Sequence, residues 1–389
     1  MKLPKLLLAL AGAATLCAAS AAALTPEETS ARRAEALDHF YSLEYSQAIP
    51  LFEQLRDADP QNATWHNHVA MSYFYEILYR AGALQGDLFG ASNRFFRTKK
   101  ITPDAALASR FHKSNDEAVK LCELRLKKVP KPQRPDEAAL YSCGVAYAAR
   151  ATYQGLVDRT LLDSLGSARR ANDFHSRLIR SNPRYFDGYL VPGLYDFLLG
   201  SLPRAAKVLF FFAGMTGDKQ RGMQKVEKVV ESGDSARHDA RILLTVMYRR
   251  EKRHADARRA MEALGAAFPR NYIFPLEIAS LHRGQGELPQ AILHYEQVLE
   301  RISDAAPGFD RAPAARIHFE LGDLYRQNGN LEAALEHLRQ VSKSQGTSGD
   351  LDRESQTLIE QITLVTVPRA AASGPMERNA LDSDGAISR

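Results

Sequence analysis

One spacing recurs along this chain of 389 residues. An alanine in an apolar segment of helical period is followed, always at the same distance, by a proline. The four pairs are Ala48 and Pro60, Ala118 and Pro130, Ala171 and Pro183, and Ala257 and Pro269. An alanine fits where two helices cross too closely for a larger side chain. A proline ends a helix because it cannot continue the hydrogen-bond ladder. The spacing therefore predicts a series of helix pairs.

The same crossing position is occupied in three further units, by Gly222, Ala291 and Ala334. From Gly222 through Ala257 to Ala291 the interval is nearly constant at about 34 residues, a period typical of a helical solenoid with two helices per unit. The intervals between the crossing residues nearer the N-terminus are much longer, which predicts three insertions. We place them near residues 79–103, 153–166 and 200–217. Insertions in solenoids often form the working face.

Two units carry the fullest motif. One contains Leu321, Gly322, Tyr325, Gly329-Asn330-Leu331, Ala334, Leu338 and Val341, and the other contains Gly144, Tyr147, Ala171, Leu178 and Pro183. This pattern resembles the tetratricopeptide repeat family over roughly residues 29–345. The resemblance implies an all-α, right-handed solenoid of about seven helix pairs within residues 24–345. It implies a generic binding scaffold, without naming a partner.

A second, local resemblance covers about residues 189–250. The succession of Ser201-Leu202-Pro203, Gly217-Asp218-Lys219 and Gly222 is similar to that of the family of tetratricopeptide repeat protein 39. It implies a related solenoid with a helical insert, and no shared activity.

The segment 1–23 has the composition of a secretory signal peptide. Lys2 and Lys5 precede an apolar run from Leu6 to Leu16, and small residues follow at 20–23. We therefore expect an exported protein of bacterial type, periplasmic or extracellular after cleavage. Lipidation at Cys17 is the disfavoured alternative, because Leu16 stands where a small residue is needed.

The C-terminal end has two expected parts. Residues 349–367 have an amphipathic pattern, and we predict a helix that caps the last repeat. Residues 368–389 lack any apolar period, and we predict a disordered tail.

The net charge of the chain excludes one class of partner. Without Lys2 and Lys5 the chain has 51 − 2 = 49 basic residues against 46 acidic ones, a net charge of +3. This near balance, with no strong basic stripe, argues against nucleic acid as a partner.

Cys122 and Cys143 lie on inward faces of neighbouring predicted helices. They form either a disulfide, which export permits, or two small buried side chains.

Catalytic and metal-binding motifs are absent from the sequence, so we expect no enzyme activity, cofactor or metal. His66 and His68 are two apart, and on a helix they would point to different sides. An enzyme site built from the insertion at 79–103 is the alternative. It would draw on Asp87, Asp104 and His112, which follow no catalytic spacing.

First helices line the concave face in such solenoids, so their inner faces predict a groove. It changes from apolar and aromatic residues to arginines along the chain, and would bind a protein segment with an apolar part and an acidic part. Alternatively, the insertions fill it. The predicted groove residues are Met71, Phe74, Tyr141, Val145, Leu190, Leu194, Phe197, Arg249, Arg250, Arg283, Asp323 and Arg326.

The third insertion contains an apolar run with Phe210, Phe211 and Phe212. The favoured interpretation is extra core packed against the solenoid, because aromatic runs are usually buried. The alternatives are a hydrophobic docking site and contact with a membrane surface. The run is too short to cross a bilayer.

Overall fold

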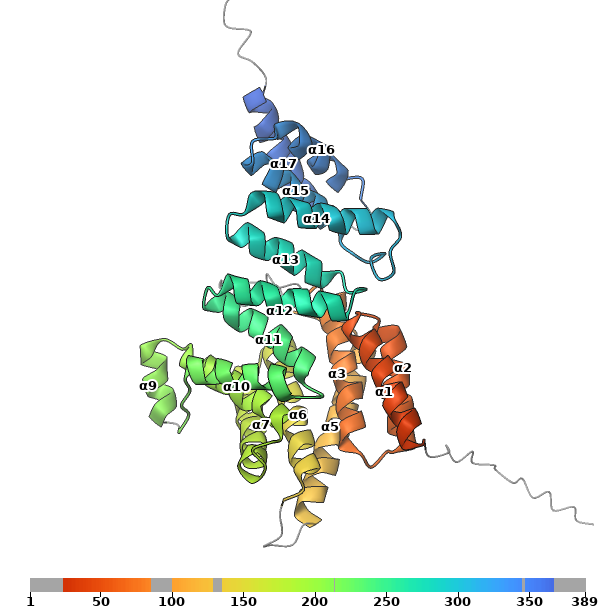
Figure 1. Ribbon diagram of the computed structural model, residues 1–389, viewed down its shortest axis with the longest axis vertical. Helices are drawn as coiled ribbons and strands as arrows, with labels where there is room; N and C mark the ends of the chain where they lie inside the picture. The colour runs from red at the N-terminus through yellow and green to blue at the C-terminus, as the bar shows by residue number, and fades with distance from the viewer. Residues whose placement is uncertain (1–23, 85–99, 129–134, 213, 345–346, 367–389) are drawn as a thin grey trace, which may run out of the picture. The chain divides into compact units, whose positions relative to one another are not determined.

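The computed structural model describes residues 24–84, 100–128, 135–212, 214–344 and 347–366 (Figure 1). The predicted signal peptide, most of the first insertion and the predicted tail lie outside these residues. The described chain contains sixteen α-helices, and none of its residues lies in a strand. The all-α fold that the sequence predicts is confirmed. None of these helices is long and apolar enough to cross a membrane.

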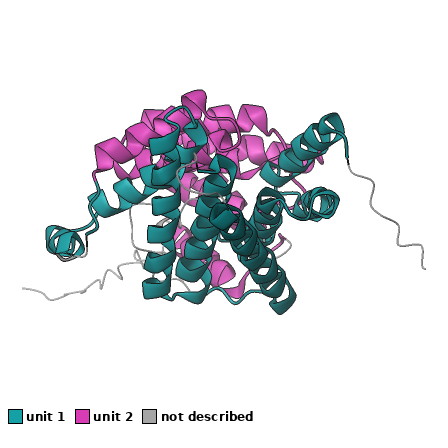
Figure 2. Cartoon of the chain, turned by 90° about the horizontal axis from the view of Figure 1, so that it is seen from below, with its two compact units in different colours: residues 1–83, 99–217 teal, residues 84–98, 218–389 magenta. Residues whose placement is uncertain are grey.

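The chain divides into two compact units (Figure 2). Unit 1 comprises residues 1–83 and 99–217, and unit 2 comprises residues 84–98 and 218–389. Each unit is built from helices that pack in sequential pairs.

Unit 1 contains three helix pairs followed by two shorter helices. The helices are α1 (Pro26–Tyr41) with α2 (Tyr45–Ala58), α3 (Ala63–Arg80) with α5 (Ala105–Lys128), α6 (Glu137–Tyr153) with α7 (Leu161–Ser181), then α8 (Leu190–Gly200) and α9 (Arg204–Phe212). A π-helical turn, Gln154–Asp158, prolongs α6 at the predicted second insertion. A 3-10 turn, Phe186–Tyr189, precedes α8.

Unit 2 contains three helix pairs between two single helices. The helices are α10 (Lys219–Ser232), α11 (Arg237–Arg250) with α12 (His254–Ala267), α13 (Ile273–Gly284) with α14 (Leu288–Ser303), α15 (Ala314–Gln327) with α16 (Leu331–Val341), and α17 (Gly349–Thr366). Helix α17 covers the last pair, with Ile362 buried against Ala334 and Leu338.

Small residues stand where paired helices cross. The six crossing alanines are fully buried, and Gly222 is buried as well. Opposite Ala334, a Cβ added at Gly322 would lie 2.6 Å from Cγ of Leu338. At Gly144 it would overlap the ring of His175. The close crossing is therefore the physical reason for these small residues.

The helix stops before proline have a common backbone geometry. Asp59, Asn182 and Phe268 each follow the last residue of a helix and precede a proline. All three have left the helical region, with φ between −139° and −130° and ψ between 71° and 90°. The ring of a following proline disfavours the helical conformation at the residue before it, so the helix ends there. Pro130 lies outside the described residues.

Four turns between paired helices share one geometry. A residue with positive φ ends the first helix: Leu43 (64°), Lys252 (58°), Gly286 (75°) and Gly329 (83°). In each turn the N–H of the next residue bonds to the carbonyl five positions before it, at 2.8–3.0 Å. This is a Schellman-type end, in which glycine is least strained. In two of the four turns this position is nevertheless occupied by a residue other than glycine, Leu43 or Lys252.

A tyrosine hydrogen bond links successive repeats at four places. A tyrosine on a first helix donates to a glutamate on the preceding second helix, and the pairs are Tyr73–Glu53, Tyr147–Glu123, Tyr248–Glu227 and Tyr325–Glu296. Burial and then the bonded carboxylate raise the pKa of both Tyr147 and Tyr248. We call this contact the tyrosine clasp. The repeat pattern within the sequence does not reveal this contact, because it joins different repeats.

Cys122 of α5 and Cys143 of α6 form a disulfide, with their Cα atoms 5.5 Å apart. The bond lies in a buried cluster that includes Ala118, Leu140 and Ala171. It joins the second helix of one repeat to the first helix of the next.

Candidate functional site

A small hollow of about 50 Å³ lies between α13 and α15 in unit 2. Four residues on one face of α13 line it, spaced by three or four positions as neighbours on a helix surface must be. The complete lining is Ile273, Leu276, Glu277 and Ser280 of α13, Tyr295 of α14, and Pro313, Arg316, Ile317 and Glu320 around α15. We call this the α13–α15 hollow. Its lining combines apolar side chains with the charged side chains of Glu277, Arg316 and Glu320.

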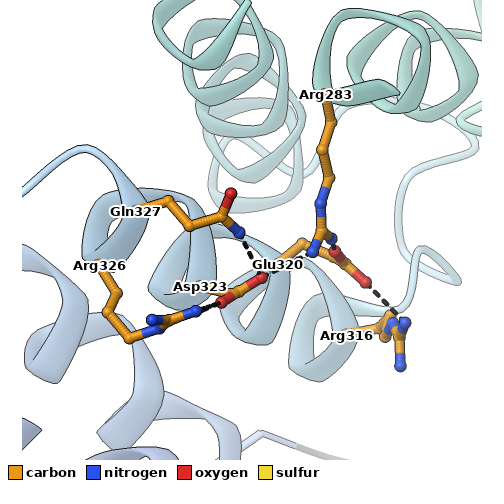
Figure 3. Close-up of polar contacts among 6 residues, drawn as sticks. All are labelled: Arg283, Arg316, Glu320, Asp323, Arg326 and Gln327. Carbon is orange, nitrogen blue, oxygen red and sulfur yellow. Dashed lines mark hydrogen bonds and ion pairs between the residues drawn. The ribbon is translucent and has the colours of Figure 1, made fainter. Parts of the chain in front are cut away.

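An ion-pair network adjoins the hollow (Figure 3). Arg283 of α13 reaches across to Glu320 and Asp323 of α15, with 2.6 Å between Nη2 and Oδ2 of Asp323. On α15 itself, Arg316 bonds Glu320 and Arg326 bonds Asp323, each at 2.6 Å. The two carboxylates are therefore held by three guanidinium groups.

A second ion pair continues the pattern towards α11. Nη1 of Arg249 lies 2.6 Å from Oε2 of Glu277, on the next first helix. Together, these pairs connect α11, α13 and α15, the first helices of three successive repeats.

In this network the acidic side chains are more buried than their basic partners. The side chain of Glu320 is 8% exposed, whereas that of its partner Arg316 is 43% exposed. Asp323 is likewise more buried than Arg326. The carboxylates thus lie underneath, and guanidinium groups form the outer layer. This part of unit 2 presents positive charge to solvent although most of its arginines are paired.

The predicted groove residues of unit 2 enter this network, with one exception. Arg249, Arg283, Asp323 and Arg326 are all ion-paired within the chain. Acidic residues on the next first helix face Arg249 and Arg283, whereas Arg326 pairs with Asp323 on its own helix. Arg250 is exposed at the end of α11.

The sequence interpretation missed Glu277, Arg316 and Glu320. The spacing of Arg316 and Glu320 by four positions was a usable signal for a pair on one helix face. Nothing in the linear pattern indicated that Glu277 would face Arg249.

The predicted groove residues of unit 1 divide into two groups. Met71, Tyr141, Val145, Leu190 and Leu194 are partly exposed. Phe74 and Phe197 are buried and do not line a surface, which corrects that prediction. The ring of Phe74 packs 5.9 Å from those of Phe111 and Tyr153, inside an aromatic cluster.

The third insertion also differs from expectation. Phe211 is 62% exposed and Phe212 is 82% exposed, so α9 does not add to the core. None of the described side chains of α9 is buried. In Figure 1, α9 is drawn well apart from α6 and α7 of the same unit.

The residues considered for catalysis or metal binding have structural roles. His66 bonds the carbonyl of Pro60 at 3.0 Å, and His68 stacks on Phe52. Asp104 caps α5 by accepting hydrogen bonds from the N–H groups of Ala106 and Leu107. His112 lies against aromatic rings, and Asp87 falls outside the described residues. No group of three His, Cys, Asp or Glu side chains in the described chain is arranged to hold a metal ion.

These features define a class. Paired helices, small crossing residues and contacts only between successive pairs characterise an α-helical repeat protein. Two family models, both described as tetratricopeptide repeat, match residues 33–87 and 273–345. The chain is a tetratricopeptide repeat protein. Such proteins are generally protein-interaction scaffolds and typically non-catalytic, and neither matching model is of an enzyme family. No curated protein matches the sequence.

Several solved structures are similar to this chain in fold. A tetratricopeptide repeat protein from Parabacteroides merdae is 14% identical, with a TM-score of 0.32, over 85% of this chain and 98% of that one. The C-terminal part of a repeat-containing protein from Cytophaga hutchinsonii is 15% identical, with a TM-score of 0.42, over 82% and 97%. A human IFIT1 dimer solved with m7Gppp-AAAA is 11% identical, with a TM-score of 0.35, over 90% and 89%. At these values the likenesses carry no functional argument.

Proposed function

We propose that this protein is a non-catalytic scaffold of the cell envelope, and that the α13–α15 hollow binds an extended segment of a protein partner. The observation that carries the proposal is the combination of a small, partly apolar hollow with an outer layer of guanidinium groups. Leu276 and Ile317 supply apolar surface to the hollow, and Arg316 stands at its edge.

The charge arrangement indicates the chemistry of the segment. One apolar side chain would enter the hollow, and its carboxylates would lie over the exposed arginines. Because Glu320 and Asp323 already neutralise part of the positive charge of the arginines, the attraction between the arginines and an acidic segment is modest. It would set orientation and association rate more than affinity. An unpaired Arg250 would strengthen the positive field at the α11 end.

The compartment is also part of the proposal. The leader-like residues 1–23 favour export, and the disulfide between Cys122 and Cys143 is typical of an oxidising compartment. Fractionation of cells, with intact-mass measurement of the protein, tests this. Loss of the leader, by cleavage close to position 23, and enrichment in the envelope fraction are expected. A full-length protein in the cytoplasmic fraction would overturn the envelope assignment and leave the binding hollow untouched.

A site-specific photocrosslinker tests the binding site. Placed at Ser280 in the hollow, it should capture one dominant envelope protein during growth. Leu293 of α14 is the matched control, because it is exposed but does not line the hollow.

Two results would argue against the hollow. One is capture of the same proteins from both positions, which indicates non-specific contact. The other is crosslinking from Ser280 only to this chain, which would mean that the chain itself fills the hollow.

A further inference from the structure

Helix α9 presents an apolar face that its own unit does not cover. Val208, Phe211 and Phe212 are spaced by three and four positions, so they lie on one face of the helix. All three are exposed. Phe211 and Phe212 contact each other edge to face, with ring centroids 5.9 Å apart.

The charge of the segment is one-sided. Residues 201–217 contain Arg204 and Lys207 and no aspartate or glutamate. Both cations stand at the start of α9, and the phenylalanines stand at its end. At 1.5 Å per residue, the two groups are separated by roughly 8–10 Å along the helix.

From this arrangement we infer that α9 is a peripheral membrane anchor that docks on an anionic lipid surface. Phe211 and Phe212 enter the boundary between headgroups and acyl chains, which interfacial helices penetrate by about 5–10 Å. Arg204 and Lys207 then remain at the level of the lipid phosphates. The absence of acidic residues between 201 and 217 removes the repulsion that such a surface would otherwise exert.

The form of the helix suits a lipid surface better than a protein groove. One face carries the exposed apolar residues Val208, Phe211 and Phe212, and the only charged residues of the helix are cations. With nine residues it docks without crossing, since crossing needs about 20. This inference does not depend on the α13–α15 hollow, which lies in unit 2.

A tryptophan reporter tests the contact directly. The chain has one tryptophan, Trp65, which is buried. In Phe212→Trp, vesicles of brominated phosphatidylcholine with phosphatidylglycerol as the minor, anionic component should quench and blue-shift the added fluorescence. Because the readout belongs to position 212, binding through residues 1–23 does not imitate it. No quenching of this signal at saturating lipid would refute the anchor.

Flotation with the same vesicles measures how strongly the protein partitions onto the lipid surface. The protein used is the processed form without residues 1–23. Arg204→Gln with Lys207→Gln should weaken partitioning about 30-fold, from about 1 kcal/mol for each cation. Phe211→Ser with Phe212→Ser should weaken it at least tenfold. The control is Leu161→Ser with Leu162→Ser, which removes two exposed leucines from α7 and should change nothing.

Two flotation results would overturn the inference. Equal losses in the control and the phenylalanine variant would show general stickiness. Unchanged flotation of the phenylalanine variant, with loss of a crosslinked envelope protein, would make α9 a protein-docking helix instead. Far-UV circular dichroism confirms that each variant is folded.

Discussion

Removal of one guanidinium group, in Arg283→Met, tests the ion-pair network between repeats. The substitution keeps the aliphatic stem and removes the contacts with Glu320 and Asp323. A hydrogen bond to a charged group contributes about 1.5–3 kcal/mol, so two bonds set an upper range of about 3–6 kcal/mol. Arg316 and Arg326 remain as partners of the carboxylates. The Arg283 side chain is also 34% exposed, so solvent screens the interaction. We therefore expect a loss of about 2 kcal/mol.

The loss has a predicted location. Arg283 is on α13, and both carboxylates are on α15, in the next repeat. In a repeat protein, such a contact stabilises the interface between neighbouring units. Hydrogen exchange should therefore accelerate about 30-fold in α15, α16 and α17, the equivalent of about 2 kcal/mol. Exchange in α11 and α12 should stay unchanged.

Two further variants make the test specific. Arg339→Met removes an exposed arginine from α16 and should shift the urea midpoint very little. Combined with Glu320→Gln, Arg283→Met should cost about 1 kcal/mol less than the sum of the single effects, because the two residues share one interaction. An effect of Arg283→Met no larger than that of Arg339→Met would refute the reasoning, as would equal acceleration of exchange in α11 and α12.

Three other predictions concern stability. Tyr147→Phe removes one tyrosine clasp and should lower the free energy of unfolding by about 1 kcal/mol in urea titrations; an unchanged midpoint would show that the bond has no net value. Lys252→Gly should raise the free energy of unfolding by about 1 kcal/mol, because Lys252 has a φ of 58°. Gly329→Ala at the equivalent turn should lower it, and changes of the opposite signs would show that positive φ is not what strains these turns. Burial lowers the pKa of His318 to about 4, so the unfolded chain takes up the proton first as pH falls from about 6.5 to about 4. The α15–α16 pair should therefore lose protection from exchange over that interval, and His318→Asn should flatten the loss.

Local rules within one repeat were readable from the sequence. The buried crossing alanines, the helix stops before Pro60, Pro183 and Pro269, and the glycine at φ 83° in the turn after α15 all follow from short-range sterics. Such positions recur with the repeat period, so pattern alone predicted the helix pairs and the all-α fold.

Contacts between repeats were decided by the tertiary structure. Arg249 lies 28 residues before Glu277, and Arg283 lies 40 before Asp323. Whether such residues face each other depends on how one repeat is rotated against the next, which the repeat period does not specify. The sequence pattern therefore did not indicate that Arg249 and Arg283 are paired within the chain.

Burial of aromatic residues was likewise settled by packing. Phe74 and Phe212 both stand in apolar, helical stretches, and the sequence interpretation placed the first on a surface and favoured the core for the second. The structure reverses both, because residues of α5 and α6 pack against Phe74, whereas no described side chain of α9 is buried. The sequence by itself determined which segments are helices and where they pair. Only the tertiary structure determined which apolar faces are covered, because a side chain is buried by the neighbours that the folded chain brings to it.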